Sequence, residues 1–158
     1  MSASLIYDLA PIGSIVAWSD GTPRPPERHK KKLSAWQTRN SQGRLIRKEG
    51  KRGVGSTSLT PCFTLHEGDL GANGVITVRI HRTFSLDSGL TFKVVERPAL
   101  GSARVFDRPG ANAELVHLAD NRQAAAEWLI RHGYPHAVLS EVTADEVAAN
   151  EIEGRAAA

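Results

Sequence analysis

Hydrophobic and polar residues alternate most clearly in the middle of the chain. Over residues 75–84 one face is apolar apart from Arg82, which predicts a half-buried strand. The turn signal Asp87-Ser88-Gly89 follows, so residues 90–96 are expected to complete a hairpin. Similar patterns predict a glycine-rich turn at 67–74 and further strands at 12–18, 60–66, 102–106, 113–118 and 137–139.

Helix signals occur in three places. Proline is tolerated in a first helical turn, so we expect a basic helix from about residue 26 to residue 40. Asp120 resembles an N-cap with Gln123 completing a capping box, and this second helix is expected to end at Gly133. A second capping-box pattern, over residues 143–146, predicts a short helix ending near Gly154.

These elements predict a single α+β domain over residues 1–158, with a mainly antiparallel sheet and two to three helices packed on one face. The length suffices for one core, and 41% hydrophobic with 23% charged residues is ordinary for a globular protein. The glycine-rich, basic segment 47–58 is expected to be a flexible loop of this domain.

Several function classes are disfavoured by composition. No apolar run approaches the roughly 20 residues of a membrane span, and the run Ser4–Leu9 is too short for a signal peptide, so we expect no membrane insertion. Cys62 stands alone, which excludes an internal disulfide framework and favours a reducing, cytoplasmic setting. The six histidines lack metal-ligand spacing, and no cofactor is expected, although His81 and His117 could meet Glu67 or Asp69 in space. No pattern in the chain indicates the oligomeric state.

Charge is distributed very unevenly. The segment from Arg24 to Arg52 holds eleven of the twenty Lys and Arg residues and two acids, a net +9, while the rest of the chain carries −6. A segment this basic is typical of one that contacts a polyanion. The candidate nucleic-acid or polyanion contacts are Arg24, Arg28, Lys30, Lys31, Lys32, Trp36, Arg44, Arg47, Lys48, Lys51 and Arg52.

Two interpretations of this segment stay open. The basic residues would release counterions from DNA or RNA, with Trp36 either stacking on a base or anchoring the helix beside Leu33. An acidic protein surface would satisfy the same charges, and the protein would then be an interaction module that inhibits an acidic partner.

Catalysis is a third hypothesis, although no motif has the specificity of a known catalytic signature. Arg79 and His81 share one face of a predicted strand, where arginine could stabilise phosphate charge and histidine could transfer a proton. Arg82 lies on the opposite face, either at a sheet edge or paired with an acid such as Glu96 or Asp107. If the protein is an enzyme, we expect either a phosphodiesterase of the nuclease type or a nucleotide hydrolase.

Two runs of the chain resemble accessory proteins of conjugative plasmids and integrative elements. They are residues 11–29, with Ser19-Asp20-Gly21-Thr22-Pro23, and residues 126–139, with Gly133-Tyr134-Pro135-His136. Among such proteins, the likeness is to fertility-inhibition factors with a ParB/sulfiredoxin-like α+β fold. The Gly-x-x-Arg phosphate-binding motif of that superfamily has no convincing copy here. The resemblance implies a cytosolic accessory protein that binds DNA or the conjugative transfer machinery.

Overall fold

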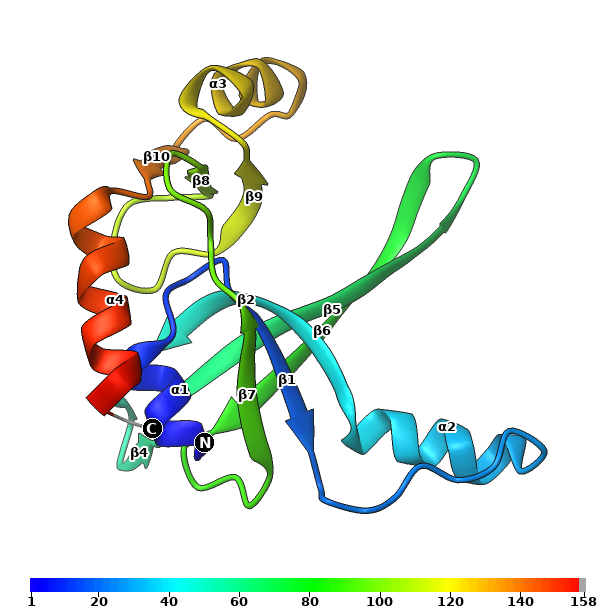
Figure 1. Ribbon diagram of the computed structural model, residues 1–158. Helices are drawn as coiled ribbons and strands as arrows, with labels where there is room; N and C mark the ends of the chain where they lie inside the picture. Colours follow the sequence, from blue (N-terminus) through cyan, green and yellow to red (C-terminus); the bar gives the residue numbers. More distant parts are fainter. Residues whose placement is uncertain (157–158) are drawn as a thin grey trace.

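The computed structural model describes residues 1–156 and contains two main antiparallel sheets (Figure 1). The larger sheet has the strand order β6-β5-β2-β1-β7, and its strands are β1 (Ile15–Ser19), β2 (Ser41–Glu49), β5 (Cys62–Ala72), β6 (Val75–Ser85) and β7 (Thr91–Glu96). The smaller sheet has the order β10-β8-β9, from β8 (Ala103–Phe106), β9 (Leu115–Ala119) and β10 (Val138–Glu141). A separate short hairpin joins β3 (Arg52–Val54) to β4 (Thr57–Leu59).

The helices serve different parts of this framework. They are α1 (Ala3–Leu9), α2 (Lys30–Arg39), α3 (Arg122–Arg131) and α4 (Ala144–Ala156). α1 packs on the larger sheet with α4 beside it, α3 packs on the smaller sheet, and α2 projects away from both (Figure 1). The α+β class with antiparallel sheets is therefore confirmed, but a single sheet with two to three helices on one face is wrong. Across the described residues, no helix has the length and apolar character needed to span a membrane.

The main core lies between α1 and one face of the larger sheet. Alternate strand residues such as Val16, Leu45 and Phe63 point to this face and are fully buried. α1 contributes Ala3 and Ile6, and the side chain of Ser2 caps it by accepting a hydrogen bond from the backbone N–H of Leu5. The sequence did not predict this helix, because two apolar residues one turn apart, Ala3 and Ile6, are a weak signal before the sheet is known.

A second, smaller core joins α3 to the smaller sheet. It holds Ala103, Val105, Ala119 and Ala125, with Trp128 packed at its edge. The predicted helix exists, but its N-cap is Asn121 rather than Asp120, because the Asn121 side chain accepts from the N–H of Ala124. The capping interaction predicted for α4 is present between the Thr143 hydroxyl and the N–H of Glu146.

The hairpin of β5 and β6 extends well beyond the core (Figure 1). The glycine-rich turn expected over 67–74 is wrong, since β5 continues to Ala72 and only Asn73 and Gly74 turn, with φ of 53° and 78°. The half-buried pattern expected for 75–84 holds near Phe84, which packs on the main core, whereas Val75, Ile76 and Val78 are exposed. Alternation alone does not reveal how far a strand extends past the layer that covers it.

Two further segments differ from expectation. The basic helix begins at Lys30 and not near residue 26, because residues 26–29 form a turn in which the N–H of His29 donates to the carbonyl of Pro26. Residues 47–58, expected as a flexible loop, form the end of β2 and the exposed β3–β4 hairpin, which turns at Gly55 with φ of 60°.

Three arginines hold the segment Leu9–Gly13, which connects α1 to β1. Arg97 donates to the carbonyl of Leu9, Arg104 to that of Ile12 and Arg44 to that of Gly13. Arg104 is buried at 6% exposure on β8, and its two terminal nitrogens also form a bidentate ion pair with Glu146 of α4. The smaller sheet, α4 and the entry to the larger sheet therefore meet at one guanidinium.

Glu146→Gln is expected to lower the free energy of unfolding by about 2–4 kcal/mol, because it leaves the Arg104 charge buried without its counterion. The range is reduced slightly from that of a fully buried pair, since the Glu146 side chain is 30% exposed. Urea denaturation measures the change. Asp145→Asn is the matched control, since it removes a neighbouring exposed charge from the same helical turn. Equal stability of the two variants would contradict this account of the junction.

Candidate functional site

A cleft of about 260 Å³ lies between the larger sheet and β9. It opens on the sheet face opposite α1, because Arg44, His66 and His81 are cross-strand neighbours and alternate with the core residues. Its lining is Arg44, Ile46, His66, Asp69, Arg79, His81, Glu114, Leu115, Val116, His117 and Leu118. This concentration of histidine, arginine and carboxylate makes it the candidate functional site.

A short polar contact between two lining residues of the cleft joins His66 to Asp69, both on β5. His66 Nε2 lies 2.7 Å from Asp69 Oδ1. In a regular strand, residues three apart point to opposite faces, but a bulge between His66 and Gly68 shifts the register. Asp69 therefore shares the face of His66. An ionised carboxylate only accepts, so the proton of a neutral His66 ring lies on Nε2 and leaves Nδ1 as the acceptor.

The neighbouring strand β6 supplies His81 and Arg79 to the same face. His81 pairs in register with His66, and the two ring centres are 5.6 Å apart with planes at 89°. Arg79 pairs in register with Asp69, and its Nε lies 3.7 Å from Asp69 Oδ1. Two imidazoles and a guanidinium therefore stand side by side, with one imidazole oriented by a carboxylate.

Arg44 extends this group on β2. Its Nη1 donates to the carbonyl of Gly13 at 2.6 Å, which fixes one end of the guanidinium. Gly13 has φ of 102°, a left-handed conformation that favours glycine. The position of Arg44 in the cleft thus depends on the turn that precedes β1.

The wall formed by β9 carries His117, which is stacked on Trp128 of α3. The ring centres are 4.6 Å apart and the planes differ by 1°. Trp128 stacks in turn on His132, at 4.0 Å. Burial lowers the pKa of His117, nearby His132 lowers it further, and Asp120 opposes the shift. The neutral imidazole is therefore favoured, as suits a partly buried ring stacked on Trp128.

Sequence reasoning found part of this site. Arg79 and His81 lie together in the cleft as their shared strand face predicted, and the neighbouring strand supplies an acid, Asp69, at 3.7 Å from Arg79. Arg82 points to the opposite face of the edge strand β6 and pairs with Glu67 at 2.8 Å. Its edge position is confirmed, but the partners expected for it, Glu96 and Asp107, are wrong.

His66 was missed as a site residue. The one available signal was its spacing to Asp69, which becomes meaningful only once the bulge is known. Within the residues that the structure describes, no three His, Cys, Asp or Glu side chains form a group suited to a metal ion.

The second candidate feature is a basic arm, residues 20–40, made of α2 and the loop that leads into it. The loop runs outward from β1 alongside the helix, which returns towards β2 (Figure 1), and the Trp36 indole N–H donates to the carbonyl of Thr22 at 2.9 Å. Trp36 is half-buried, and its hydrogen bond to Thr22 joins the helix to the loop. α2 has no buried residue. The predicted contact residues Arg24, Arg28, Lys30, Lys31 and Lys32 are all exposed on this arm.

The remaining predicted contact residues lie elsewhere. Arg44 lines the cleft, and Arg47 lies 3.8 Å from Glu49 and 3.9 Å from Glu114. Lys48 lies over the ring of Tyr7 on α1, and burial lowers its pKa, against the attraction of Asp8 and Glu153. Lys51 and Arg52 are exposed at the β3–β4 hairpin. The basic segment therefore does not form one continuous surface.

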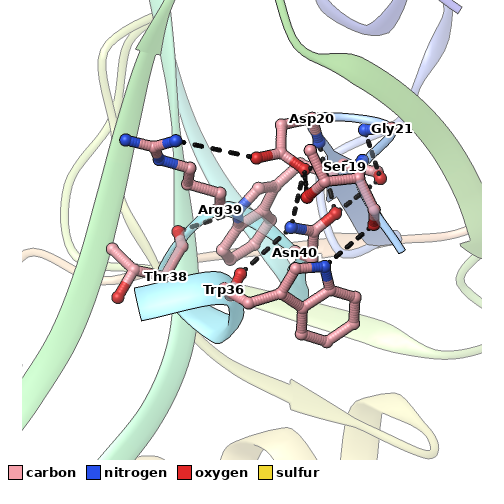
Figure 2. A network of polar contacts seen from close by, with 9 residues as sticks. Ser19, Asp20, Gly21, Trp36, Thr38, Arg39 and Asn40 are labelled. Carbon is pink, nitrogen blue, oxygen red and sulfur yellow. Dashed lines mark hydrogen bonds and ion pairs between the residues drawn. The ribbon is translucent and has the colours of Figure 1, made fainter. Parts of the chain in front are cut away.

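A polar network joins the basic arm to the larger sheet (Figure 2). The amide of Asn40 accepts from the Ser19 hydroxyl and the N–H of Asp20, and donates to the Asp20 carboxylate and the carbonyl of Trp36. Trp18 of the core donates its indole N–H to the carbonyl of Thr38. The end of α2 is thus fixed, while its other end points into solvent.

The family model described as "Uncharacterised conserved protein UCP036055" matches residues 1–146. No curated protein and no solved structure matches the chain.

Asp20 is expected to make folding depend on pH between about 2 and 4. Hydrogen bonds from Thr22 and Asn40 lower its pKa from 3.8 to about 2. A carboxyl group whose pKa is lower in the folded state stabilises that state. The contribution is complete at a pH above the pKa of the unfolded chain and is lost as the pH falls towards 2. The melting temperature of the natural protein, relative to that of Asp20→Asn, should therefore increase from pH 2 to pH 5. Thermal melts of both proteins across this range measure it, and a constant difference would contradict the assignment.

Proposed function

The chain belongs to the family "Uncharacterised conserved protein UCP036055", whose description names no activity, and we propose from its geometry that it binds nucleic acid through the basic arm. The observation that carries this proposal is a helix that has no fully buried side chain yet exposes a cluster of positive charge. Residues 24–39 hold six Lys and Arg residues and one acid. Such a surface suits the phosphate backbone of a polyanion.

The charges of α2 are poorly placed for helix stability. Lys30, Lys31 and Lys32 occupy its first turn, where the helix dipole disfavours positive charge, and the His29 N-cap makes no side-chain capping bond. Among the described residues, none of these three lysines forms an ion pair. Their arrangement costs folding energy and is accounted for by a partner with negative charge.

The resemblance of residues 11–29 and 126–139 to fertility-inhibition factors extends the proposal. The first of these runs contains the loop of the basic arm, so the likeness falls on the feature with the clearest binding chemistry. We propose on this basis an accessory role on a mobile genetic element, in the cytoplasm, where the arm contacts DNA undergoing transfer.

An acidic protein is the second candidate partner, because exposed lysines on a helix would also dock on a carboxylate-rich surface. Pull-down from lysate with and without nuclease separates the two. Loss of the captured partners after nuclease treatment supports nucleic acid, and their persistence supports an acidic protein that this module inhibits.

Replacing Lys30, Lys31 and Lys32 together with Glu is expected to nearly abolish nucleic-acid binding. Each lost phosphate contact lowers the slope of log affinity against log salt by about 0.9 for duplex DNA, so the slope should fall by roughly 2–3. Acids in the first turn favour the helix, so the loss would not come from unfolding of α2. Fluorescence anisotropy across a salt series gives both quantities.

The matched control carries Lys93→Glu, Arg108→Glu and Arg122→Glu, which change the net charge equally at exposed positions outside the basic arm. In this control, the slope of log affinity against log salt should stay as steep as in the natural protein. If both triple variants lose the same affinity, binding depends on net charge and the arm has no specific role.

A further inference from the structure

We propose that the cleft cleaves single-stranded RNA by general acid–base catalysis, with His66 and His81 as the proton-transfer pair. This activity is separate from nucleic-acid binding by the basic arm and rests on different residues. Its basis is the oriented imidazole of His66, the second imidazole with its centre 5.6 Å away, and two guanidiniums beside them.

The lining of the cleft decides the kind of nucleophile. It contains no Ser, Thr, Cys, Tyr or Lys, so no hydroxyl, thiol or amine of the protein is placed to attack a phosphorus atom. With His66 and His81 assigned to proton transfer and Asp69 to the orientation of His66, the nucleophile comes from solvent or from the substrate. A ribose 2′-hydroxyl adjoins the scissile phosphate, and such an intramolecular nucleophile has an effective concentration of about 10⁵–10⁸ M. RNA therefore fits this chemistry, and DNA lacks the group.

The arrangement supports one balanced step. Nδ1 of His66 takes the proton of the 2′-hydroxyl, since Asp69 holds the proton of the neutral ring on Nε2. The 2′-oxygen forms a bond to phosphorus while the bond from phosphorus to the 5′-oxygen breaks. Protonated His81 gives its proton to the leaving 5′-oxygen. The products are a 2′,3′-cyclic phosphate and a 5′-hydroxyl, and exchange with water restores both imidazoles.

The arginines stabilise the charge that develops on phosphate in this step. Arg79 is 42% exposed, and its Nε lies 3.7 Å from Asp69, too far for a strong hydrogen bond, so its donors are free for a phosphate oxygen. Arg44 is fixed at one nitrogen by Gly13 and presents the rest of its guanidinium to the cleft. The carboxylate of Glu114 faces Arg47 at 3.9 Å, which reduces its repulsion of an anion.

A chimeric oligonucleotide tests the proposal with the natural protein. A fluorescent single-stranded DNA carries one ribonucleotide, and the expected product is a cut at that position ending in a 2′,3′-cyclic phosphate, detected by mass spectrometry. The all-DNA oligonucleotide should stay intact. His66→Gln and His81→Gln should each reduce the rate at least about 100-fold, the usual scale of one proton transfer.

The controls use residues of the same type outside the cleft. Arg82→Gln, next to His81 in sequence but on the opposite face, and His136→Gln at an exposed position should retain the full rate. Asp69→Asn should lower kcat and leave KM unchanged, because Asp69 positions His66 without touching substrate. The proposal is overturned if the natural protein forms no cyclic phosphate above the His66→Gln/His81→Gln double variant, or cuts all-DNA equally well. Binding by the basic arm is measured independently, so either idea can fail alone.

Discussion

The buried guanidinium of Arg104 is the interaction on which the rest of the structure depends. It bonds the carbonyl of Ile12 and the carboxylate of Glu146, so one side chain of the smaller sheet joins the entry of the larger sheet to α4. Among the described residues, the buried apolar side chains of each sheet form a separate cluster. A buried charge requires its partners in exact positions, because any displacement leaves it unsatisfied. This requirement fixes the relative placement of the two sheets more strictly than apolar contact would.

The cleft is a consequence of that placement. One wall is the sheet face opposite α1 and the other is β9. Arg44 of β2 lines the cleft and donates to the carbonyl of Gly13, in the same Leu9–Gly13 segment that Arg104 holds. Bulges then decide which side chains enter. The bulge after His66 brings Asp69 to the cleft and sends Glu67 to Arg82 on the other face. A polar site is thereby formed on the side of the sheet that the main core leaves uncovered.

The unequal charge of the sequence is divided by the fold into distinct roles. Arg44 and Arg47 lie in or beside the cleft, and Lys48 packs on Tyr7. Lys51 and Arg52 are exposed at the β3–β4 hairpin, and the basic arm carries a larger exposed group of Lys and Arg residues. The arm gains no stability from a core and is held by the Asn40 network at its base. Some basic residues of this chain therefore stabilise the fold, and others form a surface suited to binding.

Local chemistry in the sequence determined the strands from 75 to 141 to within a few residues, the existence of α3 and α4, and the shared face of Arg79 and His81. Alternation, capping residues and turn residues act over a few positions, so they can be read without the fold. Only the tertiary structure decided the division into two sheets, the helix α1, the partner of Arg82 and the pairing of His66 with Asp69. These depend on bulges and on contacts between distant segments, such as Arg104 with Ile12, whose energies exist only once the chain has folded.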